Sequence, residues 1–189
     1  MKIPVGVSNR HVHLKRETLE SLFGQGFELT KRNDLTQPGQ FAANETVTIK
    51  TDKGSFDKVR ILGPLRSYDQ IEISKTDAYK LGLNPPVRNS GDLVNSERIT
   101  IVGPLNSVKV EGCIIPNRHI HISKSDAKLK GYENNQRLSV KIPGEKSGII
   151  DNVYIKILDV AFFEMHLDTD DANAHLVKQG DEVDIYESI

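Results

Sequence analysis

Two short stretches of the chain carry histidines at a spacing that suits metal chemistry. One near the start reads Asn-Arg-His-Val-His, and a second, beyond the middle of the chain, reads Asn-Arg-His-Ile-His. In a β-strand, residues i and i+2 point to the same side, so each His-x-His aims two imidazoles at one point. Neutral imidazole is a common ligand of zinc and other divalent transition metals. The pairs His11–His13 and His119–His121 are therefore predicted to bind metal.

Four similar phrases each place a candidate ligand two residues before the N-cap of a predicted helix. The residues at this position are His13, Glu72, His121 and His166. With His11 and His119 they make six candidates, one of which offers oxygen and the others nitrogen. Catalytic zinc usually has about three protein ligands and an open position, so six candidates indicate two metal ions. The one histidine outside this pattern, His175, lies in a polar stretch and is predicted to be a solvated surface residue.

The helices predicted after these phrases carry their own start and stop signals. Three of them begin with a good N-cap that is followed three residues later by aspartate, a variant of the capping box. These pairs are Ser74 with Asp77, Ser123 with Asp126, and Asp168 with Asp171. The glycines Gly82, Gly131 and Gly180 are predicted to end these helices. The first helix has Lys15 at the cap position, which is a weaker start signal.

Segments that alternate apolar and polar residues make up much of the remaining chain and predict strands. They cover residues 3–8, 45–51, 56–62, 70–74, 98–103, 108–115, 138–142, 152–158 and 181–187. Many short strands with few helices predict a mainly β protein, either a barrel or a sandwich. Because the strand–helix phrases repeat, we also expect two pseudo-symmetric halves.

The composition excludes several classes of function. The net charge is −1, which gives no support to binding of nucleic acid or of a membrane surface. No apolar run is long enough to span a bilayer. The single cysteine, Cys113, cannot form an internal disulfide, and the N-terminus carries no signal sequence, so a cytoplasmic location is expected. Cys113 lies in an apolar strand without an activating base, so it is a poor nucleophile candidate.

Arg66 is the strongest candidate for binding an anion. It follows Gly-Pro-Leu after a strand, and its counterpart in a second copy of that phrase is Asn106. A fixed guanidinium near a metal is suited to holding phosphate or carboxylate through paired hydrogen bonds. Arg10 and Arg118 precede the paired histidines in both copies, where they either support the ligands or cover a barrel mouth.

Other metal-dependent functions are also compatible with parts of the pattern. His11, His13 and Glu17 imitate the first metal motif of cupins, but Glu17 falls in a predicted helix and no second cupin motif follows. A metal-dependent hydrolase acting on a thioester is a further alternative, since histidines and a carboxylate can activate water through a bound metal. A metallo-β-lactamase motif is not complete, because Lys15 stands where an aspartate is needed. A non-catalytic module that binds metal or coenzyme A also remains open.

Six longer motifs together resemble one known family. They are VGVSNRHVHL, QPGQFAANETV, VRILGPLRSYDQIEIS, PVRNSGD, NRHIHIS and MHLDTDDANA. Together they resemble the PduL-type phosphate acyltransferases, or phosphate propanoyltransferases, along nearly the whole chain. The resemblance implies a mainly β fold of two closed β-barrels with short capping helices, the chain crossing between the barrels. It implies a first barrel from residues 1–9 plus 117–189, a second from 10–116 with a small insertion near 24–44, and a metal site between them.

The resemblance also implies a reaction, in which acyl-CoA and phosphate give acyl phosphate and CoA, and the reverse. It implies two zinc ions held by His11, His13, Glu72, His119, His121 and His166, with Arg66 handling phosphate. It places Ser8, Arg60 and Asn173 in motifs that line the CoA pocket, and Gln40 within reach of the phosphate. We expect direct attack by metal-oriented phosphate without an acyl-enzyme.

The resemblance further implies a homodimer. Members housed in microcompartments often carry an amphipathic N-terminal extension, whereas the first strand here is predicted to start almost at Met1. The expectation is therefore a free cytoplasmic enzyme. Acetyl and propanoyl groups differ by one methylene, which is worth only about 1–3 kcal/mol of discrimination, and no residue of the sequence decides between them.

Overall fold

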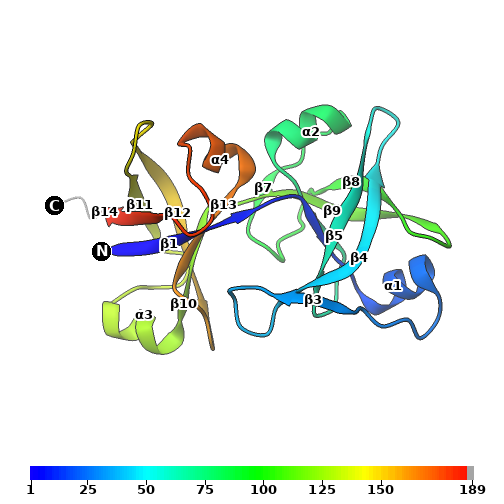
Figure 1. Cartoon of the computed structure of the whole chain (residues 1–189), viewed down its shortest axis with the longest axis horizontal. Coiled ribbons are helices and arrows are strands. Elements are labelled where there is room, and N and C mark those ends of the chain that lie inside the picture. The colour runs from blue at the N-terminus through cyan, green and yellow to red at the C-terminus, as the bar shows by residue number, and fades with distance from the viewer. Residues whose placement is uncertain (187–189) are drawn as a thin grey trace. The chain divides into compact units, whose positions relative to one another are not determined.

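The computed structural model describes residues 1–186, which form fourteen strands and four short helices. The chain divides into two compact units. The first contains residues 1–9, 36–38 and 117–189, and the second contains residues 10–35 and 39–116. The last residue of the predicted strand 181–187 lies outside the described residues. Figure 1 shows both units, and the first and last strands pair side by side within the first of them.

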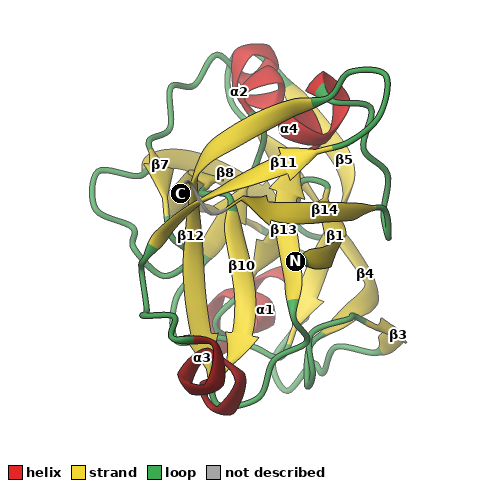
Figure 2. Ribbon diagram, turned by 90° about the vertical axis from the view of Figure 1, so that its left-hand side faces the viewer, coloured by secondary structure: helices red, strands yellow, loops and turns green. Residues whose placement is uncertain are grey.

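The strands of the first unit close into a barrel of six. In order around the barrel they are β1 (Lys2–Ser8), β13 (Glu164–Asp168), β10 (His119–Ser123), β12 (Gly148–Leu158), β11 (Arg137–Ile142) and β14 (Glu182–Tyr186). The neighbours β1 and β13 are parallel, as are β10 and β12, and the other neighbours are antiparallel. Figure 2 shows this barrel, with α3 (Lys124–Lys130) following β10 at one end.

The second unit repeats the same pattern of pairing. Its ring is β9 (Ser107–Pro116), β6 (Gln70–Glu72), β2 (His11–His13), β5 (Ser55–Gly63), β4 (Phe41–Lys50) and β8 (Glu97–Val102). It is again parallel at β9–β6 and β2–β5, and antiparallel elsewhere. Two short strands that the sequence did not predict, β3 (Lys31–Asp34) and β7 (Val87–Arg88), pair with β4 and β9. The predicted fold of two closed barrels is confirmed.

The chain changes unit at each Asn-Arg-His-x-His motif. β1 belongs to the first unit, and β2, which follows it, belongs to the second. β9 belongs to the second unit, and β10, which follows it, belongs to the first. In each barrel the His-x-His strand is therefore the first element after the chain leaves the other unit. The predicted crossing of the chain is confirmed.

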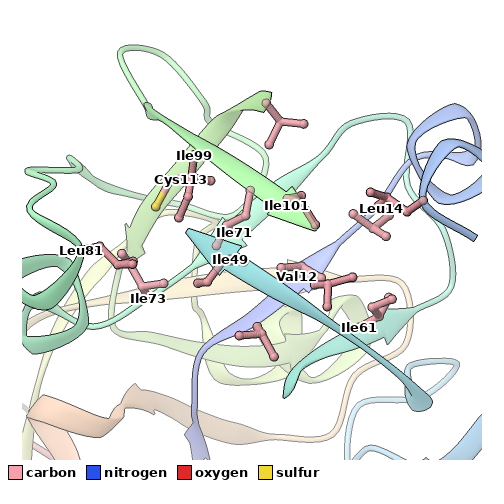
Figure 3. Packing of buried hydrophobic residues seen from close by; sticks show 14 of the residues in the cluster. Val12, Leu14, Ile49, Ile61, Ile71, Ile73, Leu81, Ile99, Ile101 and Cys113 are labelled. Atoms are coloured by element: carbon pink, nitrogen blue, oxygen red, sulfur yellow. The ribbon is translucent and has the colours of Figure 1, made fainter. Parts of the chain in front are cut away.

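Aliphatic side chains fill the two barrels. The core of the second unit is built largely from Ile, Val and Leu, including Ile49, Ile61, Ile71 and Ile101, and Figure 3 shows part of it. The first unit has a separate core of the same kind. Alternate residues of these strands point inward, and each fully buried aliphatic side chain stabilises the fold by about 1.5–3 kcal/mol. The absence of Trp is compatible with this aliphatic packing.

The helices lie where the capping signals predict them. α2 (Lys75–Leu81), α3 and α4 (Thr169–Ala174) begin after Ser74, Ser123 and Asp168, and each cap side chain accepts from the backbone N–H of the aspartate three residues on. Gly82 and Gly131 end α2 and α3 in the left-handed conformation, as predicted. The predicted stop at Gly180 is wrong, because α4 ends at Ala174.

The first helix, α1 (Arg16–Phe23), starts without a side-chain cap from Lys15. A buried carboxylate from another part of the chain replaces it. Asp69 accepts a hydrogen bond from the Lys15 backbone N–H at 3.0 Å and from the Thr18 hydroxyl at 2.6 Å. The weak local start signal is thus compensated by a long-range contact.

Candidate functional site

The second unit brings three predicted ligands together. His11 and His13 lie on β2, and Glu72 lies opposite His11 on the antiparallel strand β6. All three are buried, and one ligand atom from each lies within 4.8 Å of the others. Nε2 of His11 is 3.3 Å from Oε2 of Glu72. We call these three residues the His-His-Glu cluster.

The first unit brings the other three together in the same way. His119 and His121 lie on β10, and His166 lies opposite His119 on the antiparallel strand β13. One ligand nitrogen from each lies within 4.8 Å of the others, and the ring centroids are 4.5–5.1 Å apart. We call these three residues the three-His cluster. Both clusters therefore arise from one strand register, used once in each barrel.

The chemistry of the ring nitrogens fits a metal. Among residues 1–186, Nδ1 of His13 is a buried nitrogen without a hydrogen-bond partner, which is costly unless another species binds it. Burial, with the nearby charges of His11 and Arg66, holds the pKa of His13 well below its ordinary value, so the ring is neutral. Nδ1 of His119 lies 2.8 Å from the Asn117 carbonyl oxygen and donates to it, which leaves Nε2 for a ligand.

Arg66 is held beside the His-His-Glu cluster by a chain of polar contacts. Its guanidinium donates to the Ser90 hydroxyl at 2.9 Å and to the Tyr68 hydroxyl at 3.2 Å. The amide of Gln70 donates to the same Ser90 hydroxyl at 2.8 Å and to the Glu72 carboxylate at 2.6 Å. Arg66 is half-buried, so its guanidinium is both fixed and partly accessible. This arrangement suits recognition of an anion next to a metal ligand.

The residues expected to bind CoA and phosphate do not gather into a cluster of their own in the described contacts. Ser8 ends β1, half-buried, and Asn173 is an exposed residue of α4. Arg60 lies beside His11 on β5, where its guanidinium donates to the Ala43 and Asn44 carbonyl oxygens at 2.9 and 2.8 Å. That contact ties Arg60 to its own barrel wall. The backbone carbonyl of Gln40 accepts from Leu35, which closes a short loop.

Two residues beside the clusters were not predicted from sequence. Gln70 lies opposite His13, and Glu164 lies opposite His121, so they occupy equivalent places in the two barrels. Nε2 of His166 is 2.8 Å from Oε2 of Glu164. Both residues stand two positions before the third ligand of their cluster, and that shared position in the repeated phrases was the signal available in the sequence.

The pKa of Glu164 shows how firmly it is held. Burial alone raises that pKa, but hydrogen bonds from His166, Thr36 and Gln37 outweigh burial, so the pKa lies below its usual value. Glu164 is therefore an acceptor, and the ring N–H of His166 donates to it.

The two arginines that precede the histidines form matching ion pairs. Arg10 donates to both carboxylate oxygens of Asp77 at 2.7 and 2.9 Å. Arg118 donates to both carboxylate oxygens of Asp171 at 2.6 and 2.7 Å. Each aspartate lies in the first turn of the helix that follows the third ligand. The pairs therefore tie the start of each His-x-His strand to a helix start, which is the supporting role considered above.

The remaining candidates fall outside both clusters. Glu17 is an exposed residue of α1, so the cupin-like spacing does not assemble a ligand set with His11 and His13. Cys113 is fully buried, and burial raises the pKa of its thiol to about 12. His175 is not the freely solvated residue that was predicted, because it is half-buried and its Nδ1 donates to the Lys146 carbonyl oxygen at 2.9 Å. Within residues 1–186, no helix is long and apolar enough to cross a membrane.

Comparison with known proteins identifies the family. A family model described as phosphate propanoyltransferase matches residues 4–178. The phosphate propanoyltransferase of Priestia megaterium is 52% identical over 180 residues, which cover 95% of this chain and 83% of the relative. That of Thermotoga maritima is 50% identical over 187 residues, covering 98% and 89%. That of Salmonella typhimurium is 45% identical over 174 residues, covering 91% and 82%. The chain therefore belongs to the phosphate propanoyltransferase family and is an acyltransferase.

Proposed function

We propose that this enzyme interconverts acyl-CoA plus phosphate with acyl phosphate plus CoA, with an acetyl or propanoyl group, and that it uses two zinc ions. The observation that carries the metal part of the proposal is the repeated register, which assembles three ligand-type side chains in each barrel. Arg66, fixed beside the His-His-Glu cluster, supplies the anion recognition that a phosphate-dependent reaction needs.

The ligand chemistry favours zinc over a hard cation. Five imidazoles and one carboxylate are nitrogen-rich donors, whereas magnesium and calcium prefer oxygen. Three ligands in each cluster leave open positions, as in catalytic zinc sites. A bound zinc ion supplies Lewis acidity, which lowers the energy of negative charge on a carbonyl oxygen or on a departing thiolate.

The side chains of the enzyme then account for the rest of the reaction. Arg66 binds phosphate through paired hydrogen bonds and offsets its charge as a phosphate oxygen approaches the thioester carbon. The carbon–oxygen bond forms, the carbon–sulfur bond breaks, and the electron pair leaves with the sulfur of CoA. His13 stays a neutral ligand, and the Asn117 carbonyl keeps His119 oriented.

Direct transfer, without an acyl-enzyme, is favoured by the state of Cys113. Its thiol is fully buried in the core of the second unit, and its pKa is about 12. At neutral pH such a thiol holds almost no thiolate, which is the nucleophilic form. Phosphate itself is then the nucleophile.

The decisive experiment measures free thiol released from acetyl-CoA and from propanoyl-CoA, with and without phosphate, by protein of known zinc content. We expect release that requires phosphate, and the ratio of the two rates gives the acyl preference. Equal release without phosphate would instead identify a thioester hydrolase. No release from zinc-loaded protein would leave only a binding module. Light scattering on the same samples tests the proposed homodimer.

A further inference from the structure

Glu164 is a buried carboxylate that belongs to neither ligand cluster. It lies on β13, is 1% exposed, and faces His121 across the antiparallel pair. Its Oε2 accepts the ring N–H of His166 at 2.8 Å. Because one nitrogen of His166 is engaged in this way, the other is the nitrogen left for the three-His cluster.

Side chains from a distant part of the sequence hold Glu164 in place. The Thr36 hydroxyl donates to Oε2 at 2.6 Å, and the Gln37 amide reaches the same oxygen at 3.4 Å. The Gln37 side chain is itself fixed, because it donates to the Phe162 carbonyl oxygen and accepts from the Phe162 backbone N–H. Residues 36–38 belong to the first unit, although the strands on either side of them, β3 and β4, belong to the second. This short segment therefore supplies donors that the barrel strands do not.

The backbone opposite Glu164 makes room for its carboxyl group. Gly6 pairs with His166 across β1 and β13, and a Cβ atom at Gly6 would lie 3.0 Å from the Glu164 carboxyl carbon. In the second unit the equivalent position, opposite Glu72, holds Ile114. The residue equivalent to Glu164 there is Gln70, which supports a carboxylate ligand rather than an imidazole. The glycine therefore occurs in the first unit, where the carboxyl group of Glu164 needs the space, and a larger residue occupies the equivalent position in the second unit.

We propose that Glu164 is a positioning residue for the three-His cluster: it holds His166 in the orientation and tautomer that binds metal, and Thr36 and Gln37 hold Glu164. Gln70 plays the corresponding part for Glu72. The carboxylate is a ligand candidate in the second unit and the supporting residue in the first, so each cluster together with its supporting residue contains one carboxylate. This inference rests on the metal part of the proposed function.

The test is a chelator-competition titration of zinc on Glu164→Gln, which removes the charge and keeps the shape. We expect two zinc dissociation constants for the wild-type protein. In the variant one of them rises by about 10- to 100-fold, as is typical for loss of a partner that orients a ligand, and the other stays unchanged. The visible spectrum of the cobalt-substituted protein should change only for the weakened site.

Asp69→Asn is the matched control, because Asp69 is a buried carboxylate that supports α1 through hydrogen bonds from Lys15 and Thr18, neither of which is a candidate ligand. It should lower stability while leaving both zinc dissociation constants unchanged.

Two milder variants keep the proposal testable if Glu164→Gln fails to fold. Thr36→Val removes an exposed donor, and Gly6→Ala crowds the carboxyl group without removing any polar atom. Both should weaken the same site by a smaller factor.

Unchanged zinc constants in all three variants would overturn the role of Glu164. If phosphate-dependent thiol release persisted in that case, the proposed function would stand and only this inference would fail. A wild-type protein that binds no zinc would remove the inference together with the metal part of the proposed function, whatever the thiol assay shows.

Discussion

The two barrels use the same strand order and register but equip their ligand clusters differently. In the second unit the third ligand is a carboxylate, Glu72, and the supporting residue is an amide, Gln70. In the first unit the third ligand is an imidazole, His166, and the supporting residue is a carboxylate, Glu164. The fold fixes where the ligand-type side chains stand, whereas the choice of side chain at two positions sets the donor atoms that each cluster offers.

A second difference concerns burial of the arginine pairs. The side chain of Asp77 is 5% exposed and that of Asp171 is 23% exposed, although both accept two hydrogen bonds from their arginine. Arg10 additionally lies over the Phe56 ring, 4.1 Å from its centroid. Because an unpaired charge costs more when it is buried, we expect the second unit to depend more heavily on its ion pair than the first unit does.

Loss of a ligand should have the largest effect. In His121→Ala we expect one zinc ion to be lost per chain and transfer to fall by more than the roughly 100- to 1,000-fold that is typical for loss of a single charge-stabilising group. Glu72→Ala should remove the other ion. Zinc content by elemental analysis, with thiol release on the same samples, checks both. Loss of both ions from either variant would show that the clusters are not separate sites, and unchanged zinc would remove the residue from the ligand list.

Arg66→Ala should come next, because it removes the proposed phosphate contact and leaves the two clusters intact. Loss of one charge-stabilising group of this kind typically costs about 100- to 1,000-fold in rate. We expect a steep rise in the phosphate concentration needed, with zinc content unchanged. Asn106→Ala is the matched control, since Asn106 follows the second Gly-Pro-Leu, and its side chain donates to the Ser21 hydroxyl and accepts from the Ser107 backbone N–H. Full activity in Arg66→Ala would exclude its phosphate role.

The arginine pairs should differ in stability rather than in chemistry. Arg10→Ala leaves a buried carboxylate unpaired and should lower the free energy of unfolding by about 2–3 kcal/mol. Arg118→Ala leaves a more exposed carboxylate and should lower it by about 1 kcal/mol. Urea unfolding of the two variants against wild type measures the difference. Equal losses would mean that burial of the aspartate does not distinguish the barrels.

Changing the buried thiol should have the smallest effect on transfer. Cys113→Ala is expected to retain activity, because the thiol is fully buried and its pKa is about 12. Native protein should also resist iodoacetamide at pH 8, where almost all of the thiol is protonated, and should react only after unfolding. Mass spectrometry of the alkylated protein checks this. An acyl group found on Cys113 during turnover would contradict direct transfer.

Local patterns in the sequence determined much of this protein. Nine alternating segments predicted nine of the observed strands, since inward and outward residues alternate along a barrel wall. Ser74, Ser123 and Asp168 predicted three helix starts, because capping involves residues only three positions apart. The repeated phrases predicted all six residues of the two clusters, because a shared position before a helix reflects a shared place on a strand.

Only the tertiary structure decided how those elements are supported. Asp69 caps α1 from a distant loop, and Thr36 and Gln37 reach Glu164 across more than half of the chain. The α4 helix ends at Ala174, before Gly180, because the chain turns at Leu176, whose φ is +57°, and the N–H of Val177 donates to the Ala172 carbonyl oxygen. The N–H of Gly180 donates instead to the Val5 carbonyl oxygen. Such contacts join residues far apart in sequence, so no local pattern encodes them. The sequence by itself determined which side chains are of a type that can bind metal. The closure of each barrel decided which neighbouring side chains orient them through hydrogen bonds.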